Sequence, residues 1–330
     1  MKISVYGLGQ FGYALLRHLE KNLTDGNVLY GYDYRPSVVQ HFKKTGEHPF
    51  LYPGYKIKST TNISSFPRRI LEQADIVILS VPSSSTLDII PELQDYAKDN
   101  VILVNTAKAL DYETGKRLSL LYEDNLHKII YKYCLFAGGT IASDLFNTQI
   151  LGAVIASEDL ETANHARFIL ESDHLRLHTT TDLKGTEYAS AFKNVISIMT
   201  GIIHGKGYSY GSETYILSKI AGEVENLIIR ELGGERETFC ISSQSWGNDM
   251  FMSATGNTRN RQFGILLGKG MSTEEALLEM EKEKKTVEGI KTLEAIGKIT
   301  KLSRHPLLEY LHGTIIKKES RNLLSTISKI

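Results

Sequence analysis

Lys2-Ile3-Ser4-Val5-Tyr6 runs directly into Gly7-Leu8-Gly9-Gln10-Phe11-Gly12 at the start of the chain. The first run predicts a strand from Ile3 to Tyr6, and the second has the pattern G-x-G-x-x-G at the start of a helix. In this pattern the first glycine permits a tight turn, the second lets the backbone approach a pyrophosphate, and the third lets the helix pack on the strand. The dipole and free amides of the helix N-terminus favour the diphosphate. The stretch therefore predicts a dinucleotide site built from Gly7, Gly9, Gln10, Phe11 and Gly12.

A second apolar run, Val28 to Tyr32, ends at Asp33, roughly twenty residues after the glycine loop as in dinucleotide-binding folds. A carboxylate at this position accepts hydrogen bonds from the adenosine ribose and repels a 2′-phosphate, which favours NAD. Arg35 lies two residues further on and could instead pair with a 2′-phosphate, so NADP stays open as an alternative. Asp33 could also be a turn-forming residue of the Tyr-Asp-Tyr-Arg-Pro loop.

Further short apolar runs alternate with helical patterns up to about residue 181, which indicates βαβ units and a parallel sheet covered by helices on both faces. The expected strands are Ala74 to Val81, Val101 to Asn105, Tyr133 to Ala137, Ile150 to Ala156 and Leu175 to Thr179, with a helix from Leu160 to Leu170. After Asp182 no strand is expected, and helical patterns begin near Lys184, Tyr215, Asn260, Thr273 and Val287. A chain of 330 residues is long enough for two cores. We therefore predict an α/β fold with a doubly wound Rossmann domain over residues 1–181 and an all-helical domain over residues 182–330.

The amino-acid composition argues against nucleic acid and membranes as binding partners. Lysine plus arginine number 38, as do aspartate plus glutamate, so no overall charge attracts nucleic acid or an anionic membrane. A signal peptide and a membrane-spanning segment are not expected, because no apolar run is long enough for either. Cys134 and Cys240 lie far apart and are expected to be free buried thiols in a reducing compartment. These features favour a cytoplasmic protein that binds a small molecule.

Two lysines are candidates for proton transfer. Reduction of a carbonyl needs a proton on oxygen as well as hydride on carbon, and a lysine in a partly dry cleft can supply it near neutral pH. Lys108 closely follows a strand end in Asn105-Thr106-Ala107-Lys108, and Lys193 stands in a stretch of otherwise small or apolar residues. Taken alone, Lys193 could equally be a surface lysine with a buried stem. Pro82 also follows a strand, at the edge of the sheet where ligands bind, which predicts a cofactor contact.

The second half of the chain adds an acid and a candidate phosphate site. Asp249 closes Trp246-Gly247-Asn248-Asp249, which we interpret as a loop. Arg259 and Asn260 begin a helix, where guanidinium charge and free amides could hold a phosphate. An ordinary capped helix start is the alternative.

Taken in order, the motifs resemble the bacterial NAD(P)-dependent glycerol-3-phosphate dehydrogenase family. The matching stretches are the glycine loop, Ala74-Asp75-Ile76-Val77, Asn105–Lys108, Gly185-Thr186-Glu187, Phe192-Lys193-Asn194-Val195, Gly247–Asp249, Thr258–Gly264 and Val287-Glu288-Gly289. The resemblance covers nearly the whole chain. It implies reversible reduction of dihydroxyacetone phosphate to sn-glycerol 3-phosphate with NAD or NADP, feeding phospholipid biosynthesis.

The resemblance also implies roles for individual residues. Lys193 would be the general acid/base, Lys108 would contact substrate and cofactor, and Asp249 would orient Lys193 and the substrate hydroxyls. The remaining implied contacts are Gly138, Thr140, Asn194, Arg259 and Asn260 for the substrate, and Ala142, Arg259 and Glu288 for the cofactor. No metal is implied, and a homodimer is suggested only by analogy with other dehydrogenases.

The chain departs from the family pattern around the implied substrate pocket. Gly138-Gly139-Thr140-Ile141-Ala142 stands where the family has Gly-Pro-Ser-Phe-Ala, which removes a proline that would stiffen a turn. Asn248 and Met250 replace the neighbours of the family's aspartate, Tyr208–Glu213 replaces small residues and asparagine, and Lys219 stands for an arginine. A related phosphorylated ketone or aldehyde is therefore an alternative substrate. A non-catalytic nicotinamide-binding protein is a third interpretation, less favoured because the proton-transfer residues are all retained.

Overall fold

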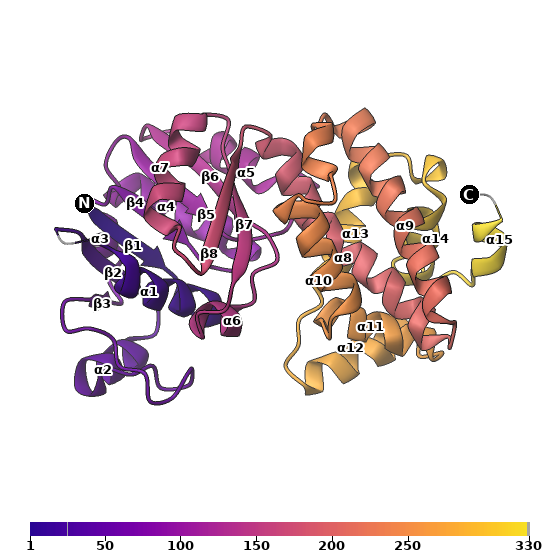
Figure 1. Cartoon of the computed structure of the whole chain (residues 1–330), viewed down its shortest axis with the longest axis horizontal. Coiled ribbons are helices and arrows are strands. Elements are labelled where there is room, and N and C mark those ends of the chain that lie inside the picture. Colours follow the sequence, from indigo (N-terminus) through magenta and orange to yellow (C-terminus); the bar gives the residue numbers. More distant parts are fainter. Residues whose placement is uncertain (25, 329–330) are drawn as a thin grey trace. The chain divides into compact units, whose positions relative to one another are not determined.

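The computed structural model describes residues 1–24 and 26–328 and separates into two units (Figure 1). The first comprises Met1–Ala107 and Leu118–Leu183, and the second comprises Lys108–Arg117 and the chain from Lys184 onward. The segment Lys108–Arg117 thus belongs with the helical unit, whereas the single boundary predicted at residue 181 assigns it to the first domain. None of the helices in the described residues is long and apolar enough to cross a membrane.

An eight-stranded sheet forms the centre of the first unit. Its strands are β1 (Lys2–Tyr6), β2 (Val28–Tyr32), β3 (Asn62–Ser64), β4 (Ile76–Leu79), β5 (Val101–Asn105), β6 (Tyr131–Ala137), β7 (Leu151–Ala156) and β8 (Leu175–Thr180). They lie in the order β3-β2-β1-β4-β5-β6-β7-β8, and only the pair β6 and β7 is antiparallel. The chain runs outward from β1 to β3 and returns to β4 on the other side of β1. This reversal is the switch point at which doubly wound folds bind ligands, and it confirms the predicted Rossmann architecture.

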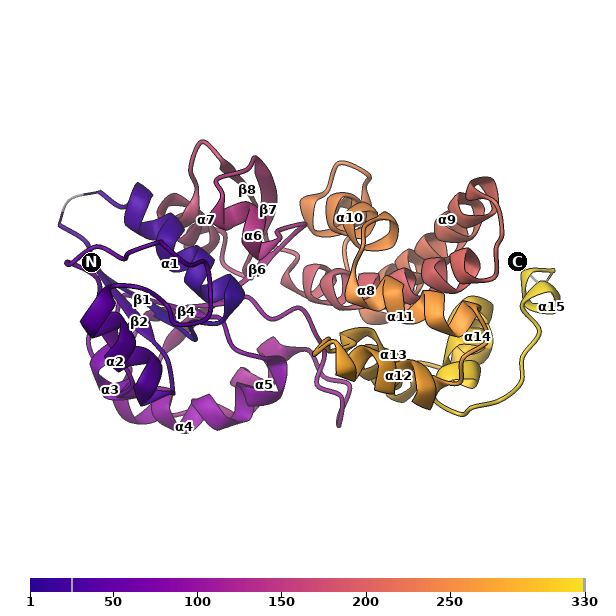
Figure 2. The same ribbon diagram turned by 90° about the horizontal axis from the view of Figure 1, so that it is seen from below.

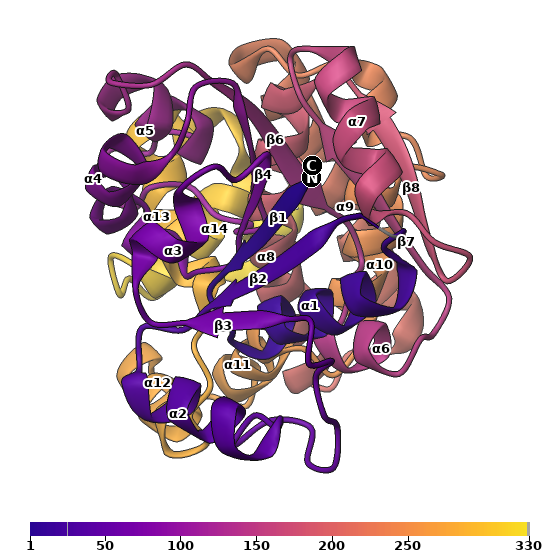
Figure 3. The same cartoon turned by 90° about the vertical axis from the view of Figure 1, so that its left-hand side faces the viewer.

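Helices cover both faces of this sheet, as Figure 3 shows. One face carries α1 (Gln10–Asn22), α2 (Pro36–Thr45), α6 (Ala142–Phe146) and α7 (Leu160–Leu170), and the other carries α3 (Pro67–Leu71), α4 (Thr86–Tyr96) and α5 (Leu118–Asn125). Side chains alternate between the two layers, because Ile76 and Ile78 pack in the first core and Val77 and Leu79 in the second. A strand with both faces buried must be apolar throughout, which explains the continuous apolar runs of the sequence.

In the described residues of the second unit the regular elements are all helices, apart from one isolated β-bridge between Leu110 and Arg117. Its helices are α8 (Leu183–Gly205), α9 (Tyr210–Leu227), α10 (Asp249–Thr255), α11 (Arg259–Gly268), α12 (Thr273–Lys282), α13 (Glu288–Ile299), α14 (Pro306–Ile315) and α15 (Leu323–Ile327). Helix α8 is buried over almost its whole length, with Phe192, Val195 and Ile196 inaccessible to solvent. A helix buried on all sides must be apolar on all sides, and any polar residue in it needs a partner.

Several local predictions need correction. Strand β3 and helix α14 were not predicted, and α9 begins at Tyr210 instead of Tyr215, because Ser209 accepts a hydrogen bond from the amide of Ser212 and caps the helix early. Cys134 is buried as expected, and its burial raises the pKa of the thiol to about 12. Cys240 is exposed, so the expectation of two buried thiols was wrong for that residue.

Glycines allow α8 and α11 to pack at very close range (Figure 2). A Cβ atom on Gly201 of α8 would lie 2.2 Å from the carbonyl oxygen of Arg261, and one on Gly264 of α11 would lie 2.1 Å from that of Ile198. Both distances are far below van der Waals contact, and the opposing atoms are backbone. The pair of helices therefore tolerates only glycine at these positions.

We expect Gly264→Ala to lower the free energy of unfolding by about 3 kcal/mol, the upper part of the range for overpacked cores. The matched control is Gly222→Ala in α9, where a Cβ would meet nothing within 4 Å. That change should be neutral or stabilise the protein by up to about 1 kcal/mol, because alanine favours helix. Urea unfolding of the two variants measures the difference in stability. Equal stabilities would contradict the close packing of α8 on α11.

Candidate functional site

The three glycines of the first loop meet three different constraints. Gly7 has a φ of +103°, and a Cβ on it would lie 2.5 Å from the carbonyl oxygen of Ser80. A Cβ on Gly12 would lie 1.9 Å from the carbonyl oxygen of Gly7, so the first turn of α1 packs directly on the loop. A Cβ atom on Gly9, the residue before α1, would meet nothing within 4 Å, and no side chain caps the helix there. Open space beside the uncapped N-terminus, where Gln10 and Phe11 begin the helix, suits a diphosphate.

Asp33 and Arg35 form one ion pair at the end of β2. The buried Asp33 carboxylate accepts hydrogen bonds from the Arg35 amide at 2.9 Å, from Nε at 2.9 Å and from Nη2 at 2.8 Å. The bond from the amide two residues on is the turn-forming interaction considered as an alternative for Asp33. The Arg35 guanidinium donates through both Nε and Nη2 to the Asp33 carboxylate. Arg35, the candidate partner of a 2′-phosphate, is therefore already paired with Asp33.

The other candidates of the first unit lie after later strands. Pro82 is exposed and follows β4. Gly138 and the buried Thr140 follow β6, where the Thr140 amide donates to the Gly138 carbonyl at 2.7 Å, and Ala142 begins α6. Their contacts with cofactor or substrate stay predictions.

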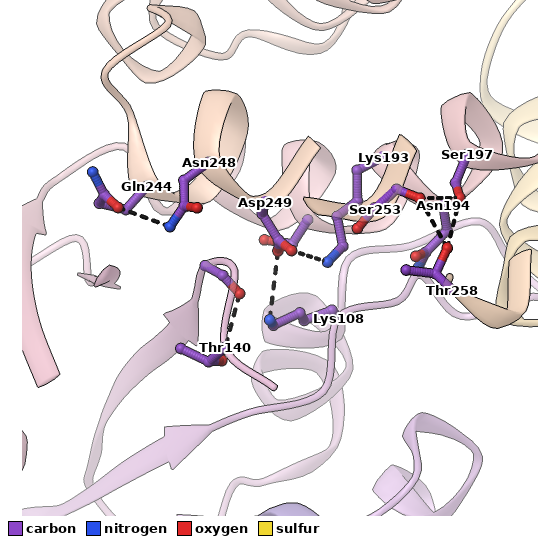
Figure 4. Close-up of polar contacts among 12 residues, drawn as sticks. Lys108, Thr140, Lys193, Asn194, Ser197, Gln244, Asn248, Asp249, Ser253 and Thr258 are labelled. Atoms are coloured by element: carbon purple, nitrogen blue, oxygen red, sulfur yellow. Dashed lines mark hydrogen bonds and ion pairs between the residues drawn. The ribbon is translucent and has the colours of Figure 1, made fainter. Parts of the chain in front are cut away.

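In the second unit, Asp249 joins the two candidate lysines (Figure 4). Lys193 of α8 donates to Oδ1 of Asp249, and Lys108 donates to Oδ2 at 3.4 Å. Asp249 is inaccessible to solvent and Lys193 is 5% exposed. Lys193 is therefore not a surface lysine. Asp249 is not in a loop either, because a helical turn at Gln244–Asn248 leads directly into α10, which begins at Asp249.

Burial and mutual charge set the protonation of this group. Burial lowers the pKa of Lys193 to about 8; the positive charge of Lys108 acts in the same direction, and the Asp249 carboxylate opposes both. Burial alone would raise the pKa of Asp249, but the two lysines outweigh it and hold the pKa below its usual value. Near neutral pH the group therefore contains a carboxylate and an ammonium ion that can release its proton readily.

A second polar group links α8, α11 and α13. Asn260 donates to Oδ1 of Asn194 at 3.0 Å, and its own Oδ1 accepts the backbone amide of Gly289 at 2.9 Å. Arg259 lies 3.8 Å from the Glu288 carboxylate, and both side chains are about half exposed. The structure thus brings Asn194 and Asn260 together, and pairs the phosphate candidate Arg259 with the cofactor candidate Glu288.

The N-terminus of α11 is not capped by a side chain. Thr258 precedes it, but its hydroxyl donates to the Ser253 carbonyl at 2.8 Å and lies 3.0 Å from the Ser197 hydroxyl. The ordinary capped start considered for this helix is therefore wrong. The sequence did not reveal that Ser197, which donates to the same carbonyl at 2.5 Å, holds this turn on α8, because the partners are 56 residues apart.

Profiles of known families match both parts of the chain. The N-terminal part of NAD-dependent glycerol-3-phosphate dehydrogenase matches residues 2–163, and its C-terminal part matches residues 182–324. The two matches follow one another in the order of that family.

Individual proteins agree with the profiles. A glycerol-3-phosphate dehydrogenase [NAD(P)+] of Moorella thermoacetica is 30% identical over 295 residues, covering 89% of this chain and 84% of its own. One of Clostridium tetani is 29% identical over 324 residues, covering 96% and 88%. The crystal structure of glycerol-3-phosphate dehydrogenase from Coxiella burnetii superposes with a TM-score of 0.83 at 20% identity, covering 99% and 98%, and supports the fold. The chain belongs to the NAD-dependent glycerol-3-phosphate dehydrogenase family.

Proposed function

We propose that this protein is an NAD(P)-dependent oxidoreductase that reversibly reduces dihydroxyacetone phosphate to sn-glycerol 3-phosphate. The observation that carries the proposal is the buried Lys193, which shares the Asp249 carboxylate with Lys108. A protein that only binds nicotinamide has no need of a buried ammonium ion with a pKa of about 8. Members of the family carry the name of this activity, which favours it over related phosphorylated ketones or aldehydes.

The proposed chemistry gives separate roles to the glycine loop and to the lysine–aspartate group. Gly7, Gly9 and Gly12 would hold the diphosphate of the cofactor, whose nicotinamide would supply hydride to the carbonyl carbon when bound. The Lys193 ammonium donates its proton to the carbonyl oxygen and becomes a neutral amine, so the product gains one hydride and one proton. In the reverse direction the neutral amine takes the hydroxyl proton. The Lys108 ammonium polarises the carbonyl oxygen, and Asp249 holds both lysines in place.

We assign the substrate phosphate to the start of α11. The Arg259 guanidinium is only loosely paired with Glu288 at 3.8 Å and is half exposed, so it can turn to a phosphate. The free amides of the uncapped helix add to this attraction. The linked amides of Asn194 and Asn260 would contact the substrate next to Lys193.

The pKa of Lys193 predicts opposite pH profiles for the two directions. Reduction needs the ammonium form, so its kcat should be constant below pH 8 and fall as the pH rises through about 8. Oxidation needs the neutral amine, so its kcat should rise through the same range. Initial rates in both directions, measured from about pH 6 to about pH 10 so that the range spans the pKa of Lys193, test these two profiles. Parallel profiles in the two directions would contradict the assignment of Lys193.

The Asp33–Arg35 pair predicts a preference for NAD. The carboxylate faces any 2′-phosphate with negative charge, and Arg35 is already occupied. We expect NADH to exceed NADPH in kcat/KM by about tenfold or more, consistent with the loss of one charged contact. Asp33→Asn should raise kcat/KM for NADPH, and a further Arg35→Ala should cancel that gain. Equal use of both cofactors by the unaltered protein would refute the preference.

The deciding experiment follows reduced-nicotinamide absorbance as the purified protein meets dihydroxyacetone phosphate. Rapid oxidation of the cofactor supports the proposal. If cofactor binds but no turnover occurs, the same assay with other phosphorylated ketones and aldehydes separates a changed substrate from a non-catalytic protein. The segment Gly138–Ala142 would then be the first place to look for altered specificity.

We further propose a cytoplasmic enzyme that acts as a homodimer. Cys134 and Cys240 are both free thiols, which suits a reducing compartment. Dimerisation rests on analogy with other dehydrogenases. Light scattering of the purified protein tests it directly.

A further inference from the structure

The segment Lys108–Arg117 carries a candidate catalytic lysine without belonging to any helix or strand. It leaves the sheet after Ala107, folds into a turn that Leu110 and Arg117 close, and returns at Leu118. Within the turn, the Asp111 amide donates to the Lys116 carbonyl at 2.9 Å. These bonds shape the segment but do not fix it on the helical unit, where the partner of Lys108 lies.

A buried ion pair anchors the far end of the segment on the helical unit. Arg117 Nη1 lies 2.7 Å from Oε2 of Glu187, and the two residues are 6% and 4% exposed. Glu187 belongs to α8, the helix that carries Lys193. Lys298 of α13 adds exposed bonds to the backbone of Tyr112 and Glu113, and Leu110 packs in the helical core.

A buried ion pair is a weak way to add stability, because the cost of desolvating both charges offsets much of their attraction. Well-packed apolar residues of similar size often serve stability equally well. The pair supplies a defined orientation, since a planar guanidinium donates to its carboxylate in only a few geometries. Such a pair fixes the register of the segment against α8, and with it the place of Lys108.

We infer that Arg117 and Glu187 are positioning residues that hold Lys108 on the Asp249 carboxylate beside Lys193. Neither needs to touch substrate or cofactor. The inference rests on the proposed function insofar as Lys108 contributes to catalysis, but the placement of Lys108 can be measured without turnover. The pair lies outside the residues that we assign to cofactor, substrate or proton transfer.

The test separates stability from position with two variants. Arg117→Met alone leaves the Glu187 carboxylate buried without its partner, so both the unfolding midpoint and kcat should fall. Replacing the pair together, with Arg117→Met and Glu187→Leu, should restore the midpoint toward that of the unaltered protein. The kcat should nevertheless stay at least tenfold low, with a smaller change in KM, because the direction of the segment is lost. Recovery of kcat together with stability would overturn the inference.

A double-mutant cycle tests whether the pair acts through Lys108. In a Lys108→Ala background, the paired replacement should cause no further loss of kcat, whereas an effect of the same size as in the unaltered protein would overturn the inference. Arg117→Lys should retain more activity than Arg117→Met but less than the unaltered protein, since lysine keeps the positive charge and lacks the planar guanidinium. Arg321→Met, which removes another paired arginine of the helical unit, is the control and should leave kcat unchanged.

Amine labelling gives a readout that does not depend on the reaction. Trinitrobenzenesulfonate modifies lysines according to their accessibility and pairing, and mass spectrometry follows each site, with the exposed Lys206 as reference. Lys108 is 16% exposed and paired, so the paired replacement should speed its labelling relative to Lys206. Unchanged labelling of Lys108 would overturn the positioning role. Lack of turnover by the unaltered protein would instead count against the proposed function alone.

Discussion

Lys193→Met is expected to reduce kcat in both directions by roughly 10³- to 10⁴-fold, the upper part of the range for general acid–base catalysis. Methionine approximates the length and volume of the lysine stem in the buried surroundings of α8 but has no proton to give or accept. Cofactor binding should persist, because the glycine loop and Asp33 belong to the first unit. Steady-state rates with calorimetric titration of NADH measure the two effects separately.

The control for this substitution is Lys206→Met, an exposed lysine just beyond the end of α8. It removes the same charge from the same region and should leave kcat within about twofold of the unaltered value, as expected of an exposed charge. Unfolding of both variants should be measured as well, since Lys193→Met also removes a partner of Asp249. A folded Lys193→Met protein that kept a tenth of its activity would rule Lys193 out as the proton donor.

The first unit was largely predictable because its signals are local. The glycine loop is a pattern of six consecutive residues, and strands such as β2 and β5 are apolar at almost every position. Both strands were predicted with their observed bounds. Strand β3 was missed because three residues, Asn62-Ile63-Ser64, carry too little pattern to identify a strand.

The site was predictable only in part, because its contacts join distant segments. Lys193 could be recognised as unusual in an apolar stretch, but nothing in that stretch showed whether the charge was buried. Its partner Asp249 lies 56 residues away. We interpreted Gly247 and Asn248 as loop residues because both favour turns, yet the backbone there continues as a helix into α10. The family resemblance, not the local pattern, joined Lys193 with Asp249.

The segment Lys108–Arg117 shows why a domain boundary cannot be placed reliably from the pattern of predicted strands and helices alone. The segment is only ten residues long and contains no helix or strand, so a change from alternating strands and helices to helices alone cannot reveal it. What assigns it to the helical unit is the packing of Leu110 and the pairing of Arg117 with Glu187, 70 residues away. Contacts between residues so far apart along the chain produce no periodic pattern in a single sequence.

Asp249→Asn should have the second-largest effect, a loss of roughly 10²- to 10³-fold in kcat, comparable to removing one preorganised electrostatic group. The amide keeps the shape of the carboxylate but no longer holds two ammonium ions by charge. Asp249 is also what opposes the lowering of the Lys193 pKa by burial and by Lys108. Without that charge the Lys193 pKa should fall further, and the decline of reduction with pH should begin at a lower pH than in the unaltered protein.

The shift in pH profile separates an electrostatic role from a structural one. Asp75→Asn is the matched control, because Asp75 is also paired with a lysine, Lys98 at 2.5 Å, and its pKa is likewise lowered, but it lies in the first unit. That change should affect stability and leave the pH profile in place. If Asp249→Asn lowered kcat while the decline stayed near pH 8, the carboxylate would only orient Lys193. If the decline moved to lower pH, the charge of Asp249 would be what keeps the proton of Lys193 available at neutral pH.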